Sequence, residues 1–181
     1  GQFLMTESEG RRMTIRQAVE KDYPEIYELV KTAFKTARVS DGTEQDFVLE
    51  LRAGSRFLPG LEFVAEEDGR LIGHVLLTRQ TVQTTAGDII GVLVAPLCVA
   101  LEYRDRGVGG QLMRTPCRQA VRAGYTAAFL VGNPAYYGRF GFRPTADFGI
   151  RNLSDIPDEV VLGCELEPGS LRDVEGSLCI L

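Results

Sequence analysis

Apolar and polar positions alternate along the chain with two periods, and these periods predict the order of its elements. Residues 14–16 are typical of a short strand. Apolar residues then recur at the spacing of an amphipathic helix: Tyr23, Ile26, Tyr27, Val30 and Phe34. Asp22 and Glu25 precede and enter this helix as a D-x-x-E pair, which predicts a capping box. Residues 43–52 predict a second helix that buries Phe47, Val48 and Leu51.

Three strands are predicted after these helices. Residues 61–66 and 71–81 are joined by a turn whose Asp68-Gly69 pair favours a tight hairpin. Residues 89–99 are almost entirely apolar, which is typical of a strand covered on both faces. A second turn at residues 84–87 connects the last two strands, so the sequence predicts a three-stranded meander.

The third strand of the meander ends in a basic, glycine-rich turn at residues 104–110, and a helical pattern starts at Gln111 and Leu112. Glycine lacks a Cβ, so its backbone can approach an anion closely. The free N–H groups and positive dipole end of a helix also favour a phosphate. The turn is therefore predicted to bind a pyrophosphate. Leu112 stands where a dinucleotide G-x-G-x-x-G motif needs its third glycine, and the chain has no G-K-[ST] of a P-loop.

The spacing R-x-x-G-x-G of Arg104, Gly107 and Gly109 resembles the acyl-CoA loop of the GNAT superfamily of N-acyltransferases. The resemblance continues upstream, where residues 96–99 are similar to the P-L-x-V strand of that family. Leu101 stands in the place of a family proline in the turn that ends at Arg104. Downstream, residues 134–142 resemble the closing A…Y-x-x-x-G-F segment, most closely in a bacterial branch of predicted N-acetyltransferases of unknown substrate.

This resemblance, which spans about residues 13–142, implies a single α/β domain over residues 13–181. The implied fold has a central mixed, mostly antiparallel sheet with helices on both faces. The sheet is expected to splay between the strand ending at Val99 and a strand at residues 127–131, where the acyl-CoA enters. The helix after the loop is expected to end near Ala123, with Gly124 as its stop and a kink at Pro116. Residues 1–12 are expected to be an extension or a remnant of added sequence.

The resemblance also implies roles for individual residues. The acyl-CoA would be bound by the backbone and side chains of one set: Leu97, Cys98, Val99, Arg104, Asp105, Arg106, Gly107, Val108, Gly109, Gly110 and Asn133. Tyr137 would be the general acid that protonates the departing thiolate. Tyr136 could instead be the inward tyrosine, or both rings could be structural. Arg104 and Arg106 could instead be solvated turn residues, and Asn133 could simply cap a turn.

No general base follows from the sequence. His74 is the single histidine and lies on a strand near the expected cleft. Four carboxylates are alternatives, and each is more typical of a solvated surface: Glu44, Glu50, Glu66 and Asp88. An acceptor amine that arrives partly deprotonated would need no dedicated base.

Composition narrows the functional class. Hydrophobic residues make up 44% and charged residues 25% of 181, which is typical of a globular protein. A net charge of −5 argues against a nucleic-acid-binding surface, and neither a membrane span nor a secretory signal is evident. The four cysteines have no paired spacing, so buried free thiols in a reducing cytoplasm are expected, without a metal site.

The sequence therefore predicts a cytoplasmic N-acetyltransferase. It would transfer the acetyl group of acetyl-CoA to a primary amine of an unidentified small molecule or protein, by direct attack in a ternary complex. The alternative is a domain that binds acyl-CoA as a sensor without turnover. Residues 145–166 are expected to form either a substrate wall or the edge of a homodimer.

Overall fold

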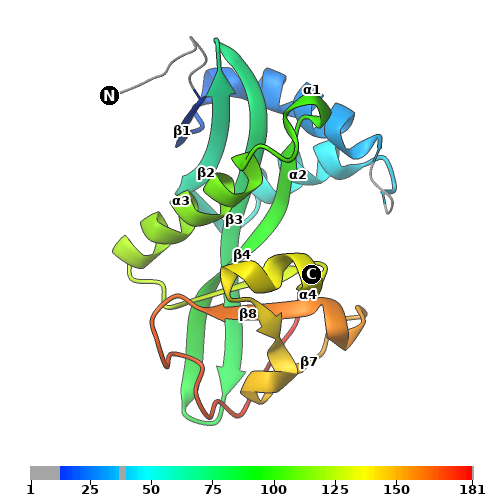
Figure 1. Ribbon diagram of the computed structural model, residues 1–181. Coiled ribbons are helices and arrows are strands. Elements are labelled where there is room, and N and C mark those ends of the chain that lie inside the picture. The colour runs from blue at the N-terminus through cyan, green and yellow to red at the C-terminus, as the bar shows by residue number, and fades with distance from the viewer. Residues whose placement is uncertain (1–12, 37–39, 181) are drawn as a thin grey trace. The chain divides into compact units, whose positions relative to one another are not determined.

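The computed structural model describes residues 13–36 and 40–180, which form two compact units (Figure 1). Unit 1 contains the described residues up to Ser55, together with Pro59–Leu76 and Pro96–Pro116. Unit 2 contains Arg56–Leu58, Leu77–Ala95 and the described residues from Cys117 onward. Some of the long strands contribute residues to both units.

Unit 1 is built from strands and helices that follow the predicted order. Its elements are β1 (Met13–Gln17), η2 (Glu20–Asp22), α1 (Tyr23–Phe34), α2 (Glu44–Ala53), most of β2 (Phe57–Glu67), the first half of β3 (Arg70–Thr84), the end of β4 (Gly87–Val99), η3 (Leu101–Tyr103) and the start of α3 (Val108–Arg122). β1 pairs antiparallel with β2, from Met13 opposite Glu67 to Gln17 opposite Phe63. Asp68 and Gly69 join β2 to β3 with positive φ angles of 52° and 76°, as the predicted tight hairpin turn requires.

Helices pack on both faces of the strands in unit 1. Apolar residues of α1 and α2 form one core with the strands: Ile26, Leu29, Val30, Ala33, Val48, Val64, Leu71, Cys98 and Ala100. On the opposite face α3 approaches so closely that a Cβ at Gly73 would lie 2.6 Å from Leu112 Cδ1. Successive strand residues point to opposite faces, so Gly73 gives α3 its room while its neighbour His74 points toward α2. Phe47 of α2, which was predicted to be buried, is 36% exposed.

Unit 2 is organised around β5 (Ala127–Val131). Besides the remaining parts of β2, β3, β4 and α3, its elements are α4 (Pro134–Tyr137), η4 (Gly138–Phe140), β6 (Arg143–Pro144), η5 (Thr145–Phe148), β7 (Ile150–Asn152), η6 (Asp158–Val160), β8 (Val161–Glu165) and β9 (Gly176–Leu178). β8 lies between β5 and β6 and is antiparallel to both. The segment at residues 145–166 therefore contributes two strands to the sheet, β7 and β8, together with the short helices η5 and η6. β9 pairs antiparallel with β3 and parallel with β7. The sheet is thus mixed and mostly antiparallel, as predicted.

The parallel pairing of β4 with β5 is short. It joins Val92 to Ala128 and Leu93 to Phe129, and the later residues of β5 keep only their β8 partners. A Cβ at Gly91 would lie 2.6 Å from Ala127 O, so this glycine permits the close approach at the start of the pair. Pairing that stops after Leu93 agrees with the predicted splay of these two strands.

The helix α3 continues through Pro116 and ends at Arg122. Gly124 follows with a φ of 99° and donates its N–H to Val121 O, so it stops the helix as predicted. The kink predicted at Pro116 stays a prediction. Within the described ranges, no helix has both the length and the apolar character needed to cross a membrane.

Candidate functional site

The glycine-rich turn of unit 1 lies where β4 has ended and α3 begins. Asp105 and Gly107 both have positive φ angles, of 63° and 80°. Glycine adopts this left-handed conformation without steric cost, and aspartate tolerates it better than most residues. Apart from Gly107 itself and its two chain neighbours, no atom of the described residues lies within 4 Å of the position of a Cβ at Gly107. The backbone at Gly107 is therefore open to a bound molecule.

The first turn of α3 presents unpaired backbone donors. Gln111 N donates to Gly107 O at 3.2 Å, which is the first bond of the helix. The N–H groups of Val108, Gly109 and Gly110 precede that bond and so have no acceptor within the helix. Together with the helix dipole, these donors form the local geometry that favours a phosphate. The guanidinium of Arg114 would lie 3.0 Å from a Cβ at Gly110, so it adds positive charge that the sequence motif did not indicate.

Arg104 anchors the turn to the rest of unit 1. Its Nε donates to Val99 O at 3.0 Å, its Nη2 to Ala33 O at 2.9 Å, and its Nη1 to Thr36 Oγ1 at 3.3 Å. The guanidinium thereby joins the end of β4 to the carboxyl end of α1, where a cation also complements the helix dipole. A direct phosphate contact by Arg104 stays a prediction. Arg106 differs, because it is exposed and its Cζ lies 5.1 Å from the ring of Tyr103.

The strand residues that precede the turn differ in exposure. Leu97 and Val99 are half-buried, whereas Cys98 is 6% exposed and packs in the core. Burial raises the pKa of the Cys98 thiol to about 12. A thiol with so high a pKa is a poor nucleophile at neutral pH, which agrees with the packing role expected for Cys98.

A buried charged network in unit 1 contains the histidine considered as a base. His74 Nε2 and Arg52 Nη2 both donate to Glu62 Oε2, at 2.8 Å and 2.6 Å, and Arg52 Nε donates to Glu62 Oε1 at 3.1 Å. The guanidinium of Arg52 also lies 3.7 Å from the ring centroid of Tyr23. His74 is 0% exposed and Glu62 3% exposed. His74 therefore orients Glu62 inside the protein and presents no surface to a substrate.

The pKa of Glu62 follows from two opposing effects. Burial raises the pKa of its carboxyl, but the hydrogen bonds from His74 and Arg52 lower it by more, so the net pKa is below the usual range. Glu62 is consequently an anion at neutral pH. It is held by its two partners as a fixed charge, which is a structural use of a buried carboxylate.

The remaining candidates for a base lie at or near the surface. Glu44 accepts a hydrogen bond from Ser40 at 2.9 Å, and Glu66 is paired with Arg16 at 2.9 Å. Glu50 and Asp88 are exposed. Their positions agree with the surface role that the sequence favoured for all four carboxylates.

Tyr137 lies in unit 2, on the short helix that Asn133 caps. Asn133 Oδ1 accepts a hydrogen bond from Ala135 N at 2.9 Å, which is the capping role considered as its alternative. Tyr137 is half-buried, while Tyr136 is 37% exposed, so Tyr137 is the inner ring of the pair. A Cβ at Gly132 would lie 2.8 Å from Tyr137 Cδ2, so this glycine makes room for the ring.

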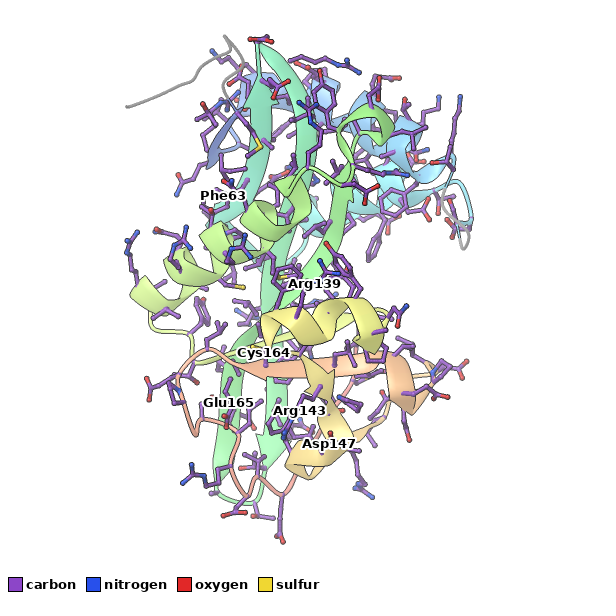
Figure 2. The ribbon with its side chains drawn as sticks, in the orientation of Figure 1. Phe63, Arg139, Arg143, Asp147, Cys164 and Glu165 are labelled. Carbon is purple, nitrogen blue, oxygen red and sulfur yellow. The ribbon has the colours of Figure 1, made fainter. Side chains whose placement is uncertain are left out.

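Aromatic neighbours fix the orientation of this tyrosine. Its ring packs edge-on against Tyr136 at 4.8 Å and against Phe142 at 6.3 Å between centroids. Arg139 covers the outer ring, with its Cζ 4.6 Å from the centre of the Tyr136 ring. The position of Arg139 is labelled in Figure 2. Burial, and to a smaller extent Tyr136, raise the pKa of Tyr137 above its ordinary value. The phenol therefore keeps its proton at neutral pH and is available as a donor.

The cysteines are free in the structure, but they are not all buried as expected. Cys98 and Cys164 are buried, Cys117 is half-buried, and Cys179 is exposed. Cys179 directly follows the short strand β9. Within the described ranges, no group of three or more His, Cys, Asp or Glu side chains is placed to hold a metal ion.

The sequence matches the acetyltransferase (GNAT) domain family over residues 14–145, which include the glycine turn, Asn133 and Tyr137. The chain belongs to the GNAT acetyltransferase family. It is 33% identical over 141 residues to the uncharacterized N-acetyltransferase YjhQ of Escherichia coli K12, covering 77% of this chain and 75% of YjhQ.

Two solved structures of relatives are also similar to this GNAT protein. The E. coli GNAT family N-acetyltransferase YhbS in complex with CoA has a TM-score of 0.81 and 28% identity, covering 94% of this chain and 90% of that one. A GNAT family acetyltransferase of Brucella melitensis in complex with acetyl-CoA has a TM-score of 0.65 and 31% identity, covering 73% and 83%. The fold and family predicted from the sequence are thus confirmed.

Proposed function

We propose that this protein transfers the acetyl group of acetyl-CoA to a primary amine of a small molecule or protein. The observation that carries the proposal is the turn at Asp105 and Gly107, which opens the backbone at the free N–H groups of α3. Relatives of the same family hold CoA or acetyl-CoA in their structures. The fit is physical as well, because a helix N-terminus with an open glycine is suited to a pyrophosphate.

Each residue of the proposed site has one task. The N–H groups of residues 106–110 bind the pyrophosphate, and Arg106 adds positive charge. The backbone of residues 97–99 bonds the pantetheine amides, and an N–H there polarises the thioester carbonyl. Acetyl-CoA supplies the acetyl group as a thioester, and the amine displaces the thiolate directly in a ternary complex.

Tyr137 is the proposed general acid. As the new C–N bond forms and the C–S bond breaks, the phenol donates its proton to the departing sulfur, and the phenolate then recovers a proton from water. The raised pKa of Tyr137 keeps the phenol protonated before the step. The amine loses its own proton to water and not to His74, because His74 is buried and hydrogen-bonded to Glu62.

The replacement of Tyr137 by phenylalanine tests the assignment, with Tyr136→Phe as the matched control on the same helix. We expect Tyr137→Phe to lower kcat by about 10²- to 10⁴-fold, the usual contribution of a positioned acid. The affinity for CoA should change little, and Tyr136→Phe should keep its rate. Turnover is measured as thiol release with a panel of amines, peptides and aminoglycosides, and CoA affinity by calorimetry.

The competing function is an acyl-CoA sensor without turnover. It predicts CoA binding by the unaltered protein but no thiol release with any acceptor. If both phenylalanine variants instead keep the rate of the unaltered protein, the proposed enzymatic activity stands but the role of Tyr137 as general acid is refuted. Failure of both CoA and acetyl-CoA to raise the melting temperature would refute the acyl-CoA site itself.

A further inference from the structure

The ring of Tyr137 occupies the place that a side chain at position 132 would take. Gly132 directly follows β5, and a Cβ on it would lie 2.4 Å from Tyr137 Cε2 and 2.8 Å from Tyr137 Cδ2. Both separations are shorter than contacts that real Cβ atoms make. Any residue other than glycine would therefore have to displace the ring or the strand end.

The ring lies on the inner side of β5. The same Cβ at Gly132 would be 3.1 Å from Leu130 Cδ1, because alternate residues of an extended chain point to the same face. Leu130 is 2% exposed and belongs to the core, whereas Tyr136 is 37% exposed. The Tyr137 ring thus continues the inner row of β5 beyond the last residue of the strand, while Tyr136 stays on the outside.

The backbone at position 132 does not itself require glycine. Gly132 N donates to Val160 O at 2.9 Å, and Gly132 is absent from the glycines with positive φ. Gly141, which follows the same aromatic segment, has a φ of 91° and is in the left-handed region that favours glycine. The closest steric conflict at position 132 is with the tyrosine ring, so the ring is the structural reason for this glycine.

The backbone on both sides of the contact is held, so an added methyl group would move the ring. Tyr137 N donates to Asn133 O at 3.0 Å, and Tyr137 O accepts Phe142 N at 3.3 Å. The end of β5 is paired with β8 as far as Val131, which lies opposite Val161. The half-buried ring can turn about its own side-chain bonds without breaking any of these contacts.

We propose that Gly132 is a positioning residue for acetyl transfer, because it seats the Tyr137 ring on the inner face of β5 and so sets where the phenol stands. This inference rests on the proposed function, in which Tyr137 donates a proton to the departing sulfur. A general acid must lie within hydrogen-bond reach of the atom that it protonates. Misplacement by about 1 Å can lower a rate on the order of 10²-fold.

A double-mutant cycle tests whether Gly132 acts through Tyr137. With acetyl-CoA and the most active amine of the panel, we expect Gly132→Ala to lower kcat by about 10- to 10²-fold and to change the KM for acetyl-CoA little. In the Tyr137→Phe background, which has no phenol to misplace, Gly132→Ala should lower kcat by no more than about twofold. An equal loss in both backgrounds, or no loss in either, would overturn the proposal.

Gly138→Ala is the matched control, since it makes the same substitution next to Tyr137. Gly138 has helical φ and ψ angles of −57° and −30°. Apart from its two chain neighbours and the backbone of its own helix, no atom of the described residues lies within 4 Å of a Cβ at Gly138. Gly138→Ala should keep the kcat of the unaltered protein, because alanine is favoured in a helical conformation. A loss of kcat equal to that of Gly132→Ala would refute the steric argument.

The position of the ring can also be followed without turnover. The chain has six tyrosines, and ¹³Cζ-labelled tyrosine gives one NMR signal for each, with that of Tyr137 identified by its loss in Tyr137→Phe. Burial raises the pKa of Tyr137, so displacement of the ring into water by Gly132→Ala should lower this pKa toward its ordinary value. An unchanged signal and titration would show that the ring keeps its place and would overturn the proposal.

Failure of the proposed function gives a different result. In that case the unaltered protein shows no thiol release, or Tyr137→Phe keeps its rate, and the NMR titration alone decides whether Gly132 seats the ring. If Gly132→Ala does not fold, it is combined with Tyr137→Ala, which removes the ring. Recovery of a cooperative melting curve supports the steric contact, and continued failure to fold refutes it.

Discussion

Glutamine at position 62 would remove the anion from the buried network that links α2, β2 and β3. Glu62 accepts three hydrogen bonds, two from Arg52 at 2.6 Å and 3.1 Å and one from His74 at 2.8 Å. Loss of one partner of a buried ion pair typically costs about 3–5 kcal/mol, because the other charge stays buried without compensation. The side chain of Arg52 is 11% exposed, so water reaches it in part and the lower end of the range applies. We expect Glu62→Gln to lose about 3 kcal/mol of stability.

The assay is thermal unfolding followed by calorimetry or circular dichroism. In a chain of this size 1 kcal/mol shifts the melting temperature by about 2–4 °C, so Glu62→Gln should melt about 6–12 °C below the unaltered protein. Glu66→Gln is the matched control on the same strand. Its partner Arg16 and Glu66 itself are each 31% exposed, and such a pair contributes at most about 1 kcal/mol. If the two variants melt at the same temperature, the buried network does not stabilise unit 1 as argued.

Lowering the pH separates the contribution of the Glu62 charge to stability from the contribution of its packing. The pKa of Glu62 lies below its usual range in the folded protein because the hydrogen bonds from His74 and Arg52 outweigh burial. The stabilisation by the carboxylate is therefore fully present above the unfolded pKa of about 4.3 and is lost as pH falls through the lower folded pKa. The melting difference between the unaltered protein and Glu62→Gln should be constant from pH 5 to 8 and shrink below pH 4. A difference that persists in acid would attribute the effect to packing.

Three shorter predictions concern other positions. Gly107→Ala places a methyl group in the open turn at a φ of 80°, which costs about 1–2 kcal/mol, so the KM for acetyl-CoA should rise about tenfold in steady-state assays; an unchanged KM would contradict the role of the turn. Gly73→Ala sets a Cβ 2.6 Å from Leu112 Cδ1 and should lower stability by about 1–3 kcal/mol in urea titrations, whereas full stability would show that α3 shifts freely. Iodoacetamide at pH 8 should label exposed Cys179 well before Cys98, whose pKa is raised to about 12, and peptide mass spectrometry would reveal the opposite order.

The parts of the fold that the sequence predicted correctly depend on local geometry. Asp68 and Gly69 form the hairpin turn because both residues tolerate positive φ angles. Gly107 and Gly124 adopt left-handed conformations at the two ends of α3 for the same reason. Glycine at such a position is visible in the sequence without knowledge of its neighbours, so the turn that carries the proposed function was predictable.

The contacts of charged side chains were much less predictable. Arg104 fitted a phosphate motif, yet its guanidinium bonds Ala33 O, 71 positions away in the chain. Glu62 follows Leu61 within an apolar strand pattern, and no local pattern indicated that His74 and Arg52 would converge on it. A long side chain can reach several elements, and the element it reaches depends on how strands and helices pack. Such partners come from tertiary structure alone.

The failed capping box at the start of α1 shows how magnitudes decide between local and tertiary contacts. Asp22 was expected to cap the helix, but its carboxylate accepts two hydrogen bonds from Arg16, at 2.7 Å and 2.9 Å, and one from Val19 N at 2.8 Å. Glu25 was expected to complete the box and instead accepts Leu71 N at 2.9 Å. A cap contributes about 1 kcal/mol, whereas one hydrogen bond to a charged group contributes about 1.5–3 kcal/mol. The bidentate arginine therefore outweighs the cap, and the carboxylate that signalled a helix start joins β1 to α1.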